Sequence, residues 1–209
     1  MIINIGRQLG SGGHEVGIKL ANELGYNFFD REILQKATED SGISTELFEQ
    51  ADERALSART TSWFGSRLNI WGATGAPFSG GLTDEGLFQI QSETIRRLAE
   101  RGNSVFIGRC ADYILRERTD CVSVFICAAK DDRIARIMRL RGINERQAAS
   151  LIDKTDKQRA TYYNFYTDRE WGKASSYDLT INTSTFSIDT VVKILAGGVR
   201  HVGYNTPTL

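Results

Sequence analysis

Hydrophobic residues along the chain alternate between short runs of strand-forming residues and longer stretches with helical spacing. The short runs predict strands at residues 2–5, 26–29, 104–107, 122–127 and 179–181. The longer stretches predict helices at residues 14–24, 31–38, 87–101, 111–115, 131–140, 144–152, 157–165 and 188–195. Strands that alternate with helices need crossover connections, so the pattern predicts an α/β fold with a parallel sheet. In such a fold the ligand site lies at the carboxyl ends of the strands.

One segment interrupts this alternation. Residues 57–81 contain five glycines and two tryptophans but no sustained periodicity. Loops of that length are usually functional or disordered, and the aromatic residues favour partial order. We expect an irregular insertion that acts as a lid or as an oligomer contact, and a homodimer through this segment is a hypothesis. Residues 1–209 as a whole are expected to form a single domain.

Composition and charge exclude several classes of protein. Hydrophobic residues make up 41% and charged residues 25%, as in a soluble folded protein. The 26 basic and 26 acidic residues balance, so the net charge does not indicate a nucleic-acid partner. No apolar run approaches the roughly 18 residues that a membrane helix requires. The first five residues lack a basic region and read as a strand instead of a signal peptide. We therefore expect a cytoplasmic protein with neither a nucleic-acid nor a membrane partner.

Cysteine and histidine usage gives no sign of a metal site. Cys110, Cys121 and Cys127 lack C-x-x-C spacing, and the chain has only two histidines. We interpret the cysteines as small buried thiols and assign no residue as a metal ligand. His14 and His201 form no Ser-His-Asp or Cys-His arrangement that would indicate a nucleophile.

The strongest local signal is the glycine-rich run Arg7-Gln8-Leu9-Gly10-Ser11-Gly12-Gly13-His14, between a predicted strand and a predicted helix. Glycines in that place let backbone N–H groups converge on a phosphate at the positive end of a helix. The regular motif is G-x-x-x-x-G-K-[ST], and here Gly12 fits its second glycine. Arg7, Gly13 and His14 stand where the first glycine, the lysine and the Ser/Thr would be. The run predicts either a phosphate-binding loop or only a tight turn.

Arginines supply the second signal. Arg109 follows a predicted strand directly, where its planar guanidinium can bind a phosphate in the expected crevice. Arg133 and Arg136 share a helix face, and Arg159 belongs to the same basic stretch. Each of these residues alone could be a surface ion-pair partner or part of a solvated helix face. As a set beside a glycine-rich loop, they indicate phosphoryl transfer, which needs positioning and positive charge more than covalent chemistry.

The order of these motifs resembles that of the nucleoside monophosphate kinases, most closely the cytidylate kinase-like family, whose members share an R-Q-x-G-S-G-G loop. The likeness starts at that loop and continues through residues 24–34, 108–113, 154–159, 162–163, 167–172 and 177–184. It implies a three-layer P-loop NTPase fold, in which helices flank a parallel five-stranded sheet. It also implies a helical lid at residues 141–173.

The resemblance implies ATP-dependent transfer, with Mg²⁺, to a mononucleotide such as CMP or dCMP. The donor phosphates would bind to the loop residues, which are Arg7, Gly10, Ser11, Gly12, Gly13 and His14. The acceptor would bind to residues at the ends of two strands and in the helix after the second strand, which are Asp30, Lys36 and Arg109. The catalytic cations would be Arg109, Arg133, Arg136 and Arg159.

Two departures from the regular loop leave alternatives open. Gly13 supplies no positive charge to the β- and γ-phosphates, and His14 supplies no hydroxyl for Mg²⁺. Arg7 and Arg159 are candidates for the missing cation. Otherwise the protein binds nucleotides without efficient turnover, in a regulatory role. A third reading is a kinase for another small molecule, such as a sugar or a vitamin precursor, because the acceptor segment departs most from the family pattern.

Overall fold

The computed structural model describes residues 1–31, 33 and 84–199, which form a parallel sheet of five strands. The strands are β1 (Ile2–Arg7), β2 (Asn27–Phe29), β3 (Ser104–Ile107), β4 (Cys121–Cys127) and β5 (Leu179–Asn182). Their spatial order is β2-β3-β1-β4-β5. Because β1 lies at the centre, between β3 and β4, the order reverses there, and a crevice is expected at its carboxyl end.

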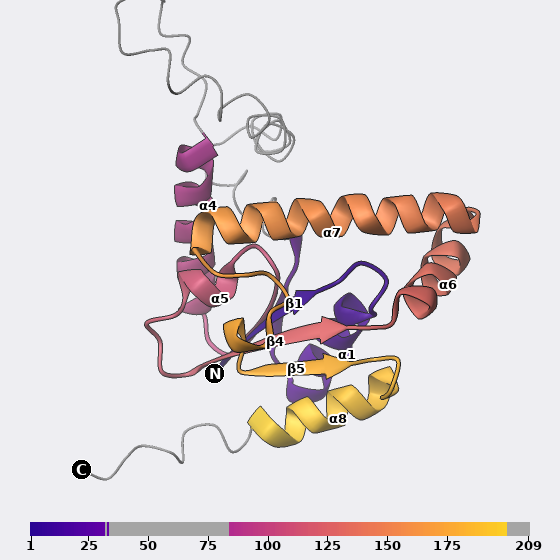
Figure 1. Ribbon diagram of the computed structural model, residues 1–209. Coiled ribbons are helices and arrows are strands. Elements are labelled where there is room, and N and C mark those ends of the chain that lie inside the picture. Colours follow the sequence, from indigo (N-terminus) through magenta and orange to yellow (C-terminus); the bar gives the residue numbers. More distant parts are fainter. Residues whose placement is uncertain (32, 34–83, 200–209) are drawn as a thin grey trace, which may run out of the picture.

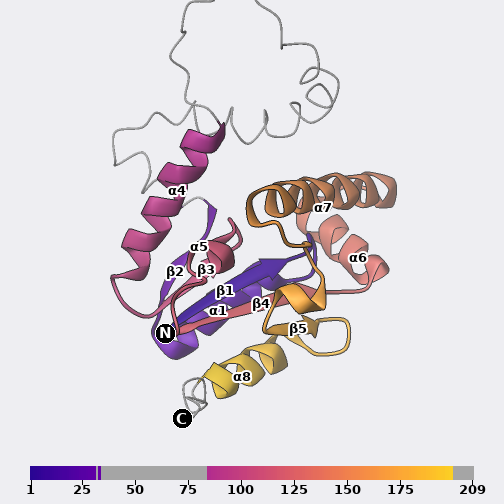
Figure 2. The ribbon, with the colours of Figure 1, turned by 60° about the vertical axis from the view of Figure 1, so that its left-hand side comes forward.

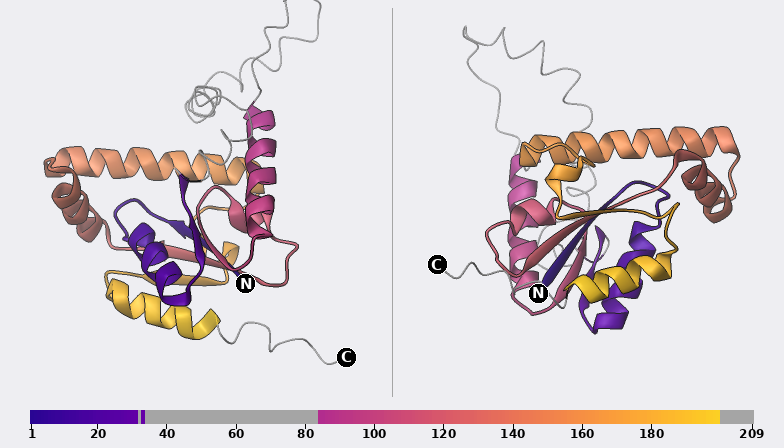
Figure 3. Two further views of the ribbon diagram at one scale, coloured as in Figure 1. Left: turned by 180° about the vertical axis from the view of Figure 1, so that it is seen from behind. Right: turned by 60° about the horizontal axis from the view of Figure 1, so that its bottom comes forward.

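Helices cover both faces of the sheet (Figure 1, Figure 2). One face is covered by α1 (Gly13–Leu24) and α8 (Ile188–Val199). The other is covered by α4 (Asp84–Ala99), α5 (Ala111–Ile114) and the last turns of α7 (Glu145–Thr167). Helix α6 (Lys130–Arg141) packs against the first half of α7, as both views of Figure 3 show, and a short 3₁₀ helix, η1 (Ala174–Ser176), precedes β5.

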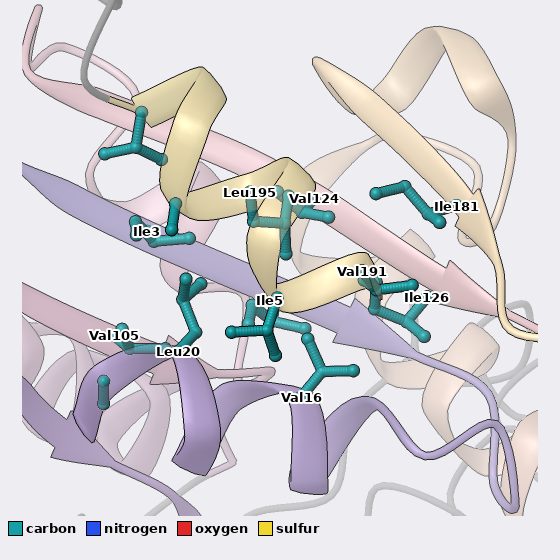
Figure 4. Close-up of a cluster of buried hydrophobic side chains, with 14 of the residues drawn as sticks. Ile3, Ile5, Val16, Leu20, Val105, Val124, Ile126, Ile181, Val191 and Leu195 are labelled. Atoms are coloured by element: carbon teal, nitrogen blue, oxygen red, sulfur yellow. The ribbon is translucent and has the colours of Figure 1, made fainter. Parts of the chain in front are cut away.

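The alternation of side chains along β1 explains the two layers. Ile3 and Ile5 point to one face of the sheet and Ile2 to the other, because neighbouring residues of a strand face opposite ways. Figure 4 shows the first cluster, which joins β1 to α1 and α8 through Ile3, Ile5, Val16, Leu20, Val191 and Leu195. On the opposite face, Ile2 packs with Phe106 of β3. Burial on both faces is typical of a parallel sheet and fixes its register.

The predicted α/β fold with a parallel sheet is confirmed, and each predicted strand is found within about two residues of its expected bounds. One prediction was wrong: the two helices expected at residues 144–152 and 157–165 are a single helix, α7. The residues between the two expected helices are polar, and there Asp153 and Asp156 form ion pairs with Lys130 and Arg133 of α6. These polar residues of α7 therefore hold α7 against α6.

Some predictions fall outside the described residues. These are most of the helix expected at 31–38, Lys36 within it, and the insertion at 57–81. In the part of the chain that the structure covers, no helix combines the length and apolarity needed to span a membrane.

The central strand gives a direct test of this core. Ile5 is 0% exposed in β1, whereas Ile194 of α8 is 41% exposed. Ile5→Ala should lower the free energy of unfolding by roughly 2–5 kcal/mol, because it leaves a cavity between the sheet, α1 and α8. Ile194→Ala removes the same atoms from a partly solvated site and should cost well under half as much. Urea unfolding of both variants measures the difference, and equal losses would contradict this placement of the core.

Candidate active site

The chain between β1 and α1 turns sharply at two glycines. Gly10 and Gly12 have φ angles of 80° and 79°, in the left-handed region that favours glycine. Gly12 is the N-cap residue of α1 and, having no side chain, makes no side-chain cap bond to the N–H groups of the first helical turn. Those N–H groups, at the positive end of the helix dipole, are the groups that a phosphate would use. The geometry is that of a phosphate-binding loop.

Hydrogen bonds from the segments after β4 and after β5 hold this loop. The fully buried Ser11 donates its hydroxyl to the Gln8 carbonyl at 2.9 Å. The Thr183 hydroxyl donates to the Ser11 carbonyl at 2.7 Å, and the Gln8 side chain accepts the Ala128 N–H at 3.1 Å. The Ser11 hydroxyl is thus engaged within the loop, which leaves the backbone to meet a ligand.

The carboxylate of Asp156 holds the loop from the side of α7. Its Oδ1 accepts the N–H of Leu9 at 2.8 Å, and its Oδ2 pairs with Nη1 of Arg133 at 2.5 Å. Arg133 in turn donates to the Leu9 carbonyl at 3.4 Å. The two side chains are only 9% and 16% exposed. Arg133, which the sequence suggested as a catalytic cation, is therefore buried beside a carboxylate and fixes the position of the loop.

Arg136, which is also on α6, lies against Gly12. A Cβ at Gly12 would collide with Nη1 of Arg136, so the guanidinium needs the bare glycine beside it. That Nη1 is buried without a hydrogen-bond partner in the described residues, and the Glu15 carboxylate lies 4.0 Å away. Beside it is a cleft of about 510 Å³, lined by Gly10, Ala128, Asp132, Ala135, Arg136, Arg139, Thr183 and Ser184. A nucleotide with its phosphates on the loop would have room there for its nucleoside.

A strained turn follows β3. Gly108, Arg109 and Cys110 have φ angles of 69°, 59° and 55°, a run of left-handed residues of which two are not glycine. Such residues cost on the order of 1–3 kcal/mol each and cluster at functional sites. The turn directs the chain into α5 and carries Arg109 at the carboxyl end of the sheet.

Two side chains from other helices orient Arg109. Gln91 of α4 accepts a hydrogen bond from Arg109 Nη1 at 3.4 Å and donates Nε2 to the Arg109 carbonyl and to the Tyr162 hydroxyl. Cζ of Arg109 lies 6.0 Å from the centre of the Tyr162 ring. Among the described contacts, an amide and a phenol thus orient Arg109.

Other predicted residues gather beside Arg109. Nη1 of Arg159 donates to the Arg7 carbonyl at 3.0 Å. Burial and, after it, the positive charges of Arg159 and Arg109 lower the pKa of Arg7 to about 9. Burial is also the main cause of the lowered pKa of Arg159. Charged groups are therefore held close together at the ends of β1 and β3, where a bound anion would relieve their repulsion.

His14 and Asp30 form a pair at the edge of this group. His14 Nε2 lies 3.1 Å from Asp30 Oδ2, and Asp30 Oδ1 accepts the N–H of Ile33. Asp30 is mostly buried, with a side chain 18% exposed, whereas that of His14 is 53% exposed. His14 therefore faces the end of β2, the side of the sheet on which the sequence placed the acceptor.

The structure thus gathers two groups of predicted residues. Asp30, Arg7, Arg109 and Arg159 surround the carboxyl ends of β1 to β3, while Arg133 and Arg136 lie on α6 against the loop glycines. Sequence reasoning did not identify the residues that hold these groups in place, which are Gln8, Gln91, Tyr162 and Thr183. Gln8, Tyr162 and Thr183 lie in segments that carry the family likeness, but the motifs do not reveal what they contact, because each acts across a long separation in the chain.

Comparisons with known proteins agree with this geometry. The family model described as "Cytidylate kinase-like family" matches residues 2–185. A cytidylate kinase from Saccharolobus islandicus is 25% identical, over 100% of this chain and 96% of the relative. A solved structure of an uncharacterized protein from Eubacterium ventriosum is 26% identical with a TM-score of 0.71, and covers 96% of this chain and 99% of that one.

A gluconokinase from Sinorhizobium meliloti has a TM-score of 0.55 at 16% identity, and covers 97% of this chain and 93% of the gluconokinase. At that identity the likeness concerns the fold alone. Together with the strand order, it identifies the three-layer fold of the P-loop kinases, as the sequence motifs implied.

Asp156 and Asp153 form a matched pair for testing the support of the loop. Both lie in α7 and pair with α6, but Asp153 and its partner Lys130 are 62% and 52% exposed. Asp156→Asn should cost roughly 3–5 kcal/mol of unfolding free energy, because Arg133 is left buried without its counter-charge. Asp153→Asn should cost at most about 1 kcal/mol. Urea unfolding measures both variants, and a loss for Asp156→Asn no larger than that for Asp153→Asn would contradict the assignment.

Proposed function

Because this chain belongs to the cytidylate kinase-like family, we propose that it transfers the γ-phosphoryl group of ATP to a nucleoside monophosphate, such as CMP or dCMP. The observation that carries the proposal is the pairing of a phosphate-binding loop after β1 with an oriented Arg109 after the neighbouring strand β3. This arrangement provides one place for each of two phosphorylated molecules, at adjoining points of one sheet edge.

The donor would bind on the loop side. Backbone N–H groups from Gly10 to His14 would hold its phosphates at the start of α1. Its nucleoside would occupy the cleft between α6 and the segment after β5, where Arg136 and Arg139 lie. Arg136 has a buried Nη1 free of hydrogen bonds in the described residues, so it can donate to a phosphate oxygen without breaking an existing hydrogen bond.

The acceptor would bind on the side of β2 and β3. Arg109 would hold its phosphate, with help from Lys36, which lies outside the described residues, and Asp30 would contact another part of the acceptor. Arg159 reaches the same place from α7, and its hydrogen bond to Arg7 connects the segment 141–173 to the loop. We assign this segment the role of a cover that limits access of water to the reacting groups.

In the transfer step, an oxygen of the acceptor phosphate forms a bond to the γ-phosphorus as the bond to the β,γ-bridging oxygen breaks. The products are ADP and a nucleoside diphosphate. The protein supplies alignment and positive charge, with Arg109 and Arg159 beside the phosphoryl group and Arg133 holding the loop.

Mg²⁺ would enter with the phosphates of ATP. In kinases this ion keeps several waters and uses only one or two protein carboxylates, and its charge neutralises that of the phosphates. Within the described residues no cluster of three or more His, Cys, Asp or Glu side chains could hold a metal ion. Asp30 is the carboxylate at the sheet edge that fits this limited role, as its oxygens are the ligand type that Mg²⁺ prefers.

The test is phosphoryl transfer from labelled ATP with Mg²⁺ to a panel of ribo- and deoxyribonucleoside monophosphates, with gluconate as a non-nucleotide acceptor. Arg109→Ala should reduce transfer by about 10²–10³-fold, since it removes one well-placed charge stabiliser. Arg118→Ala, which removes an exposed arginine paired with Asp120 ahead of β4, is the matched control and should leave the rate unchanged.

Transfer to one nucleotide that depends on Arg109 supports the proposal and names the acceptor. An unchanged rate in Arg109→Ala contradicts the assigned site, provided that circular dichroism shows both variants folded. Transfer to gluconate alone would instead identify a kinase for a non-nucleotide acceptor. Binding of ATP without transfer to any acceptor would favour the regulatory reading.

A further inference from the structure

Two departures of this loop from the regular motif are in direct contact. The regular motif has glycine where Arg7 stands and lysine where Gly13 stands. A Cβ built on Gly13 would lie 2.5 Å from Cβ and 3.1 Å from Cγ of Arg7, and 3.2 Å from Cβ of Ile126. The first distance is too short for any side chain, so a lysine at position 13 is incompatible with the Arg7 stem. The two replacements therefore depend on each other. The long cationic side chain stands at the end of β1, where the regular motif has glycine, instead of at the start of α1.

A second glycine accommodates the other end of the Arg7 side chain. At Gly108, directly after β3, an added Cβ would collide with Nη1 of Arg7 and lie 3.3 Å from its Cζ. The side chain thus runs from the first turn of α1 across to the end of β3. Its guanidinium reaches the crevice between two neighbouring strands, beside the residue that precedes Arg109.

The described residues around Arg7 leave its charge uncompensated at close range. Among the described residues, no carboxylate is paired with its guanidinium within 4.0 Å, and Asp30 only partly offsets the repulsion from Arg159 and Arg109. The lowered pKa of Arg7 has this repulsion as its second cause, after burial. A half-buried cation in such a setting destabilises the free protein and binds a polyanion strongly.

We infer that Arg7 does the work of the loop lysine, donating N–H groups to the β- and γ-phosphate oxygens of the donor, and that Gly13 and Gly108 are glycines because the Arg7 side chain occupies their side-chain space. This inference rests on the proposed function for the identity of the donor. It assigns Arg7 a direct catalytic role, since negative charge grows on the β,γ-bridging oxygen as the bond to the γ-phosphorus breaks. A guanidinium also offers a paired set of donors, which suits two phosphate oxygens at once.

The two replacements can be reversed by mutation. Four proteins are compared: the natural chain, Arg7→Met, Gly13→Lys, and the double variant Arg7→Gly/Gly13→Lys. Binding of labelled ATP is measured by equilibrium dialysis, and transfer is measured with the acceptor panel. Arg7→Met should lose about 10²–10³-fold in rate and bind ATP more weakly. Gly13→Lys should also lose activity, because its side chain meets the Arg7 stem. The double variant should recover at least tenfold over either single variant, since it restores a lysine with space around it.

A stability measurement separates a catalytic role from a structural one. Burial and the neighbouring arginines disfavour the charged form of Arg7 in the folded protein, so at pH 7 its charge opposes folding. Arg7→Met keeps most of the apolar stem and removes the charge. Its midpoint of urea unfolding should therefore stay unchanged or rise while ATP binding falls. A structural role predicts that both fall together. Arg118→Ala is again the control, with unchanged ATP binding.

The outcomes distinguish this inference from the proposed function. If the natural protein binds ATP but transfers to no nucleotide, the proposed function fails, and ATP binding by Arg7→Met still decides the role of Arg7. Undiminished ATP binding and transfer in folded Arg7→Met would overturn the inference. So would full activity of Gly13→Lys alone, because the two side chains would then coexist. If the double variant does not fold, the comparison of Arg7→Met with the natural protein remains decisive.

Discussion

The whole site depends on the contact that one carboxylate, Asp156, makes with the loop after β1. Glycines give that loop its sharp turns, but each ordered residue costs about 1–2 kcal/mol of backbone entropy. A glycine-rich loop without external bonds would not hold a fixed shape. Asp156 binds the N–H of Leu9 and the guanidinium of Arg133, and so sets the loop against both α6 and α7. Because α6 also carries Arg136, the same contact brings that cation beside the loop glycines.

The arginines of the site have different partners. These partners distinguish an arginine that supports the loop from arginines that we propose contact phosphate. Arg133 is held by a carboxylate, which largely cancels its charge. Arg109 is oriented by the amide of Gln91, and Arg159 by a backbone carbonyl. These described contacts fix the orientation of each guanidinium at the carboxyl end of the sheet. Electrostatic catalysis requires such preorganised charges, whose orientation is already fixed before the reaction.

The sequence predicted the sheet because its strands are buried on both faces and read as short apolar runs. The sequence also predicted the loop and the place of Arg109, because both lie just after predicted strands. It failed at α7, where Asp153 and Asp156 look like a polar break until their partners on α6 are known. The sequence could not distinguish the surroundings of Arg133 from those of Arg136, because residues three apart on one helix face can have entirely different neighbours. The contact between Arg7 and Gly13 joins the end of β1 to the start of α1. The motif could name Arg7 only as one of two candidates for the missing cation, because it does not show this contact.

The turn after β3 explains why the strained backbone at Arg109 and Cys110 is kept. Gly108 must lack a side chain because the guanidinium of Arg7 occupies that space. Directly after it, the left-handed residues turn the chain into α5 and direct Arg109 toward Gln91 and Tyr162. The turn therefore meets two demands at once: it makes room for the guanidinium of Arg7, and it directs Arg109, the cation that we propose binds the acceptor, toward its partners. A relaxed turn would satisfy one of these demands only, so under the proposed function its strain is what allows two phosphates to meet at one sheet edge.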